Sequence, residues 1–302
     1  MGLALIVLTF SSCKKFSGDV TIPAFVHLDY IDIVPQSEEA PSTEPGFYSS
    51  LIDAVQFTGY FEGDTAEINF GTFQLPCQVP VLRHGTMKYL VVTPVLKQDG
   101  ASGTRIEYPF FMPKKLENIR LAPDSTTNLG TYNPSTNKWS IETYYRTRKQ
   151  MTVLMEEYFE PTSFSIGFDS TMIWERDAMG LACTGQGYGR VHIDSGVSNV
   201  PFMVKSGLSA PKGSMLYLEM DYWTDVDLAV NMTAELVSGS TQGTVGVITL
   251  YANAHWQKIY INLGRSWRQL NYNSPFFVSF QALNLDGKEH DVRIDNVKIL
   301  AR

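Results

Sequence analysis

The stretch Leu216-Tyr217-Leu218-Glu219-Met220-Asp221-Tyr222 decides the fold class, because apolar and polar side chains alternate along it. An alternation with period two is typical of a half-buried antiparallel strand. The same alternation recurs at Ile259–Leu263 and Val278–Ala282. In Val292–Ile299 the apolar phase slips by one residue at Asp295-Asn296. A slip of one residue turns every later side chain to the other face, so we expect a β-bulge there.

Towards the N-terminus, the chain carries short β runs about every 8–12 residues, punctuated by glycine and proline. This spacing favours a small antiparallel sandwich. A turn-rich segment with weaker strand signals separates it from the second set of strands. We therefore predict an all-β protein of two β-sandwich domains, the C-terminal one a jelly roll. The predicted parts are an N-terminal β-sandwich at 22–122, a linker with connecting strands at 123–158, and the C-terminal jelly-roll domain at 159–302.

Length and charge limit the classes of function. A chain of 302 residues can bury two separate cores. The net charge of −7 includes no block of like charge, which argues against a nucleic-acid partner. Cys77 and Cys183 fall in different predicted domains, so we expect two unpaired cysteines; the alternative is a disulfide that clamps the domains together.

The N-terminus carries an export pattern. Leu3–Leu8 is an apolar run too short to span a bilayer, and Ser11-Ser12-Cys13 follows it. This arrangement resembles the lipobox of bacterial lipoproteins, in which the cysteine carries the lipid. The resemblance implies a lipoprotein signal segment at 1–13, lipidation of Cys13 and a tether at 14–21. The alternative is a first strand with a buried cysteine.

The sequence contains no recognisable catalytic motif. Its five histidines show no paired metal-ligand spacing, and neither a Gly-x-Ser-x-Gly elbow nor a phosphate-binding loop occurs. We therefore expect a protein that is not an enzyme.

The second domain resembles the jelly-roll modules of the galactose-binding-like, carbohydrate-binding type. The matching pieces, in chain order, are Glu157–Glu160, Gly187–Val191, Tyr217–Tyr222, Trp256–Leu263 and Ile294–Ile299. The resemblance implies a structural calcium held by Glu160 and Asp295, whose oxygens suit a hard cation. The alternative is a turn-capping aspartate and a solvated glutamate.

Across its whole length the chain is similar to exported lipoproteins of Bacteroidota. The matching order is Leu75-Pro76, Val81-Leu82, Gly100, Thr104-Arg105 and Tyr108-Pro109-Phe110. The resemblance implies a lipid anchor in the outer membrane and, as partners, an outer-membrane barrel and other lipoproteins, as in the barrel-assembly machinery. We expect the cell-surface face; because no acidic run follows Cys13, the periplasmic face stays open as an alternative.

Three aromatic residues are candidates for a binding surface: Trp223, Trp267 and Tyr272. Trp223 lies opposite the apolar face of its strand, and Trp267 lies between arginines in a predicted loop. Trp256 opens a strand and is expected to be structural. Our first functional hypothesis is a non-catalytic interaction subunit of an outer-membrane complex, for barrel assembly or export. The alternative is a carbohydrate-binding surface lipoprotein of a glycan-uptake system.

Overall fold

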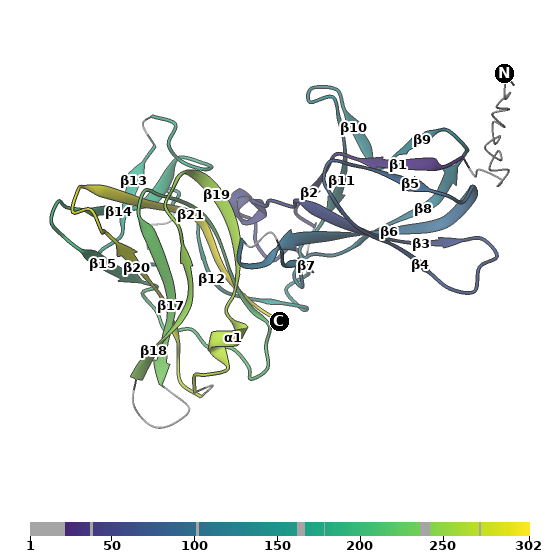
Figure 1. The fold of residues 1–302 in the computed structure, drawn as a ribbon. Helices are drawn as coiled ribbons and strands as arrows, with labels where there is room; N and C mark the ends of the chain where they lie inside the picture. Colours follow the sequence, from purple (N-terminus) through teal and green to yellow (C-terminus); the bar gives the residue numbers. More distant parts are fainter. Residues whose placement is uncertain are drawn as a thin grey trace, which may run out of the picture.

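The computed structural model describes residues 22–36, 39–100, 103–161, 167–177, 179–235, 242–271 and 273–302. In these residues the chain forms two β-sandwiches that lie side by side (Figure 1). The predicted all-β fold with two sandwiches is confirmed. Cys13 and Tyr272 lie outside the described residues, so the structure does not bear on either prediction.

The N-terminal sandwich is built from three small sheets. Their strand orders are β5-β1-β9, β10-β11-β2 and β4-β3-β6-β7, with β8 also paired to β6. The bounds are β1 (Ala24–Leu28), β2 (Tyr30–Ile33), η1 (Pro45–Tyr48), β3 (Ala54–Phe61), β4 (Ile68–Gln74), β5 (Cys77–Val81), β6 (Gly85–Lys97), η2 (Gln98–Gly100), β7 (Arg105–Glu107), β8 (Lys114–Leu121), β9 (Thr126–Asn128), β10 (Thr131–Asn133) and β11 (Lys138–Thr143).

The C-terminal sandwich has two facing sheets. One has the order β13-β14-β21-β16-β19, with β12 paired to β21, and the other has the order β15-β20-β17-β18. The bounds are β12 (Thr152–Glu157), β13 (Ile173–Arg176), β14 (Gly187–Ile193), β15 (Asn199–Met203), β16 (Leu216–Thr224), β17 (Asp227–Glu235), β18 (Gln242–Leu250), β19 (Asn253–Asn262), α1 (Gly264–Trp267), β20 (Phe277–Leu283) and β21 (His290–Ala301).

The alternation that predicted these strands places their apolar side chains in the core between the two sheets. Leu218 and Met220 of β16 pack there with Val230 of β17 and Phe280 of β20. The expected bulge in β21 is confirmed, because the β16–β21 register shifts between Glu219 and Asp221. Asn296 adopts φ 49°, a left-handed conformation that asparagine tolerates better than most residues.

The segment 123–158, predicted to be a linker with connecting strands, is divided between the two sandwiches. β9 pairs with β1 and β11 pairs with β2, both in parallel, so this part completes the first sandwich. β12 pairs with β21 and extends the large sheet of the second. The turn signals at 123–137 indicated a boundary between the domains. Strands β9, β11 and β12 of this segment instead pair with strands more than 90 residues away, which assigns each of them to one of the two sandwiches.

The two sandwiches share a buried interface. The outer face of the large C-terminal sheet presents Tyr217 and Tyr260 to Tyr108 of the N-terminal sandwich, with ring centroids 5.2 and 5.1 Å from the Tyr108 ring. Two hydrogen bonds also cross the interface. The backbone amide of Leu51 donates to Tyr260 Oη over 2.9 Å, and the backbone amide of Asn262 donates to Asp99 Oδ1 over 2.7 Å. The face of β16 that reads as polar and exposed in the sequence is therefore largely covered by the other domain.

Two further findings concern the cysteines and the membrane. Cys77 and Cys183 are both free, as expected from their separate domains. Among the described residues, no helix combines the length and the apolar character that crossing a bilayer requires.

Candidate functional site

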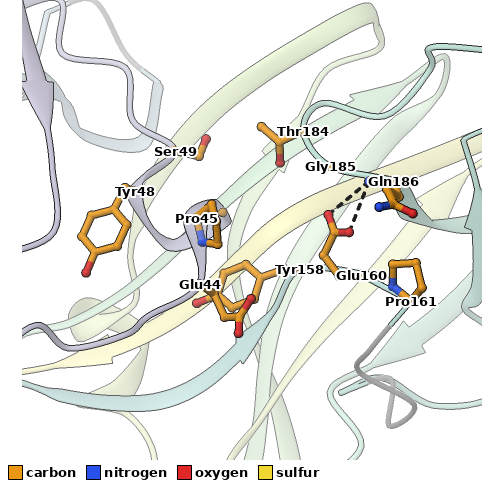
Figure 2. A pocket seen from close by; sticks show the side chains of 11 residues that line it. Glu44, Pro45, Tyr48, Ser49, Tyr158, Glu160, Pro161, Thr184, Gly185 and Gln186 are labelled. Atoms are coloured by element: carbon orange, nitrogen blue, oxygen red, sulfur yellow. Dashed lines mark hydrogen bonds between the residues drawn. The ribbon is translucent and has the colours of Figure 1, made fainter.

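A cleft of about 690 Å³ opens where the two sandwiches meet; we call it the interdomain cleft. Its size falls within the range of roughly 300–1,000 Å³ that is typical of small-molecule sites. Three segments far apart in the sequence form its walls (Figure 2). The lining residues are Glu44, Pro45, Gly46, Tyr48, Ser49, Tyr158, Glu160, Pro161, Thr184, Gly185 and Gln186.

The first wall is the short 3-10 helix η1 of the N-terminal sandwich. Pro45 stands in its first turn, where a missing amide hydrogen costs nothing. Tyr48 donates its hydroxyl to the carbonyl of Ser42 over 2.7 Å, which fixes the direction of the ring. A Cβ atom on Gly46 would lie 2.3 Å from Asn296 Oδ1 and 2.8 Å from Tyr158 Cδ1, so only glycine allows η1 to approach the jelly roll this closely.

The second wall follows β12. Tyr158 is 8% exposed, and its hydroxyl donates to Glu156 Oε2 over 2.6 Å. Burial raises the pKa of the Tyr158 hydroxyl, and the hydrogen bond to Glu156 raises it further, so this group remains a donor. The next residue, Phe159, has φ 52°, and this turn directs Glu160 and Pro161 to the other side of the cleft (Figure 2).

The third wall is the loop Thr184–Gln186 that precedes β14. The backbone amide of Gln186 donates to both carboxylate oxygens of Glu160, over 3.2 and 3.3 Å. Gly185 has φ 67°, and a Cβ atom there would collide with Glu160 Oε1. The loop is therefore held against Glu160 by its backbone, and a glycine is required at its centre.

Beneath this loop lies a cluster of buried polar groups. Asp295 Oδ2 accepts from the Thr184 amide over 3.1 Å, and Asp221 Oδ2 accepts from Ser49 Oγ over 2.6 Å. Lys258 Nζ lies 3.3 Å from the same Asp221 oxygen, and both side chains are nearly inaccessible. Desolvation by burial raises the pKa of Asp295 to about 8. These contacts connect the floor of the cleft to the bulge of β21 and to η1.

The predicted calcium ligands, Glu160 and Asp295, hold two ends of the same loop. Asp295 accepts from the amides of Thr184 and Asn296, and Glu160 accepts from that of Gln186. Calcium takes roughly six to eight oxygen ligands, whereas the groups aimed at these carboxylates are mostly N–H donors. Within the described ranges, no three His, Cys, Asp or Glu side chains are grouped so that they could hold a metal ion. The arrangement does not fit calcium, although the capping contacts do explain both residues.

Two of the predicted aromatic residues, Trp223 and Trp267, do not line the interdomain cleft. Trp267 belongs to α1, is 1% exposed and packs against Phe276, so its prediction as an exposed binding residue is wrong. The flanking arginines suggested a surface loop, but the short helix turns the indole into the core. Trp223 is partly exposed, with the Arg293 guanidinium 4.3 Å from its ring centroid.

Trp256 is held in place by a hydrogen bond, because its Nε1 donates to the carbonyl of Leu181 over 2.7 Å.

The lining tyrosines Tyr48 and Tyr158 were not predicted as site residues. Tyr48 follows a proline-rich stretch that reads as a loop, and Tyr158 reads as part of the linker. The local signal for Tyr48 was the aromatic pair Phe47-Tyr48 that follows Pro45-Gly46.

The lining of the cleft offers groups that can bind a polar ligand. These groups are two carboxylates, hydroxyls, the side-chain amide of Gln186, backbone groups and the rings of tyrosine and proline. Cys183 lies directly before the loop Thr184–Gln186 and does not line the cleft, and burial raises the pKa of its thiol to about 12, which disfavours the nucleophilic thiolate.

Comparison with known proteins adds a likeness of fold. No family model matches the sequence, and no curated protein matches it. Among solved structures, the chain is similar to a family 11 carbohydrate-binding module from Clostridium thermocellum in complex with a β-1,3-1,4-mixed-linked tetrasaccharide, with 12% identity and a TM-score of 0.34 over 49% of this chain and 94% of that one.

Two further structures show the same kind of likeness. One, from a study of carbohydrate-binding modules of the β-sandwich superfamily, has 11% identity and a TM-score of 0.33 over 92% of this chain and 98% of that one. The other is a family 29 carbohydrate-binding module variant, with 16% identity and a TM-score of 0.30 over 50% of this chain and 84% of that one.

Proposed function

We propose that this protein is a non-catalytic carbohydrate-binding protein whose interdomain cleft holds the glycan. The observation that carries the proposal is the pairing of fixed apolar rings with hydrogen-bond acceptors in one cleft. Tyr48 has its hydroxyl tied to a backbone carbonyl, so its ring is oriented before any ligand arrives. Across the cleft stand Glu160 and Gln186 (Figure 2).

This combination fits the chemistry of a sugar. The ring of a sugar has an apolar C–H face, which packs against aromatic or proline rings, and a rim of hydroxyls, which need acceptors and donors. Pro45 and Tyr48 supply the first kind of surface and Glu160 supplies acceptors. Because hydrogen bonds hold the walls in place, little conformational entropy is lost when a ligand binds.

The test is a glycan array followed by calorimetry on the folded two-domain chain, residues 14–302. We expect Tyr48→Ala to weaken the binding of an array ligand about tenfold, the loss expected for one stacked ring. Tyr132→Ala is the matched control, because Tyr132 is 42% exposed on β10 and does not line the cleft. Absence of any glycan ligand, or equal effects of the two substitutions, would contradict the proposal.

The proposed location is the outer membrane, with the protein anchored by lipid on Cys13. The support comes from the sequence pattern around this cysteine. Cys13→Ala should move the protein from the detergent phase to the aqueous phase in a detergent partition of cells that express the full chain. Unchanged partition would contradict the lipid anchor.

A second candidate function, the interaction subunit of an outer-membrane complex, has one structural observation in its favour. β13 is an edge strand of the large sheet, and it exposes 50% of Ile173. Nearby in the chain, Met179 is 78% exposed. Unpaired edges with apolar side chains are common places for protein contact. Recovery of an outer-membrane barrel with the wild-type chain, but not with Ile173→Lys, would support this role.

A further inference from the structure

We infer that the interdomain cleft selects neutral or basic glycans and rejects acidic ones. The inference rests on the proposed function and concerns the class of glycan. It follows from the sign of charge on the cleft walls, which carry the carboxylates of Glu44 and Glu160 and include no lysine, arginine or histidine among the lining residues.

Three cations of the neighbouring segments do not line the cleft. Lys258 lies beneath the floor with 3% of its side chain exposed and is paired with Asp221. Lys149 has 80% of its side chain exposed and pairs with Glu39. Arg148, whose charge acts on the Tyr48 hydroxyl, donates its Nε to the carbonyl of Pro41 over 3.1 Å. The charges that the lining residues themselves carry are therefore those of Glu44 and Glu160.

The hydrogen-bonding capacity points in the same direction. Ionised carboxylates only accept hydrogen bonds, so the ligand groups that they can bind directly are donors. The Tyr48 and Tyr158 hydroxyls, which could have donated, are committed to Ser42 and Glu156. Sugar hydroxyls and protonated amino groups are donors, whereas a uronate or sulfate brings further acceptors and a like charge. Like charges in a partly dehydrated cleft repel more strongly than in water.

The experiment compares neutral ligands with acidic counterparts that have the same sugar backbone. We would titrate the two-domain chain by calorimetry with neutral hexasaccharides of glucose, galactose and mannose. Each would be compared with its counterpart in which the C6 hydroxymethyl groups are oxidised to carboxylates. At low salt we expect at least one neutral ligand to bind tenfold or more tightly than its acidic counterpart. The difference should shrink in 0.5 M salt, because ions screen repulsion at the cleft mouth.

The variants identify the responsible residues. Glu44→Gln together with Glu160→Gln removes both charges and keeps an acceptor oxygen at each position, so we expect the preference to fall to less than threefold. Glu117→Gln is the control, since Glu117 is an exposed glutamate on β8 that does not line the cleft.

The outcomes separate the two claims. Equal binding of neutral and acidic ligands, or tighter binding of acidic ones, would overturn this inference and leave carbohydrate binding intact. An undiminished preference in the double variant would also overturn it. Failure of every ligand in the array and in the titrations to bind would refute the proposed function itself and the selectivity with it.

Discussion

The ammonium group of Lys298 lies 2.8 Å from the carboxylate of Glu219, and neither side chain is exposed to solvent. Both residues lie on neighbouring strands of the jelly roll, but residues of the N-terminal sandwich supply further hydrogen-bond partners for the pair. Tyr108 and Tyr145 each donate a hydroxyl to Glu219 over 2.7 Å, and Lys298 donates to Tyr145 Oη and to the carbonyl of Phe47. The interdomain cleft borders this interface, so its shape depends on the contact between domains.

Lys298→Met should destabilise the protein strongly. The substitution keeps most of the volume but leaves Glu219 charged, buried and without its cation, which costs roughly 3–5 kcal/mol of unfolding free energy. Chemical denaturation would measure the loss. The double variant Glu219→Gln, Lys298→Met removes both charges and should recover much of it; a double variant no more stable than the single one would contradict this account.

Tyr108 and Tyr145, the two tyrosines that contact Glu219, should contribute different amounts to the free energy of unfolding. Tyr108→Phe removes one donor to the carboxylate, and we expect a loss of about 1–3 kcal/mol. Tyr145→Phe should cost more, because the Tyr145 hydroxyl donates to Glu219 and also accepts from Lys298. Tyr251→Phe is the control, as Tyr251 is 77% exposed. Equal melting temperatures for all three variants would show that these hydroxyls contribute nothing.

Asp295 should make stability depend on pH. Its folded-state pKa of about 8 lies above the ordinary value of 3.8, because burial favours the neutral carboxyl. The folded state thus holds a proton that the unfolded state releases, so this contribution is complete below pH 4 and is lost as pH rises through 8. At about 1.4 kcal/mol per pKa unit, the loss amounts to a few kcal/mol.

The measurement is the difference in unfolding free energy between the wild type and Asp295→Asn from pH 4 to pH 9. The asparagine cannot ionise, so the variant should gain stability relative to the wild type across this range. A difference that is flat with pH would exclude the titration of Asp295 as its source.

Removing the buried indole of Trp267 should destabilise the protein. With 1% exposure and a ring packed on Phe276, Trp267→Ala should cost about 3–5 kcal/mol. Trp223→Ala, in contrast, removes a partly exposed ring and should cost less than half as much. Thermal unfolding would compare the two. Full stability of Trp267→Ala would contradict the position of the indole.

Alternation along β16 determined its strand character and the identity of its core face, and a slip in phase located the bulge at Asn296. Both features arise from the period-two geometry of a strand, which is local to the backbone. Sequence alone therefore determined the all-β class and the positions of β16, β19, β20 and β21.

Tertiary structure alone decided what covers the polar face of β16, where alternation predicts Glu219 on the side facing water. Contact with Tyr108 and Tyr145, more than 70 residues away, turned that face into an interface. The same reason applies to the interdomain cleft: Tyr48, Glu160 and Gln186 carry no shared pattern, and long-range packing of two domains brings them together.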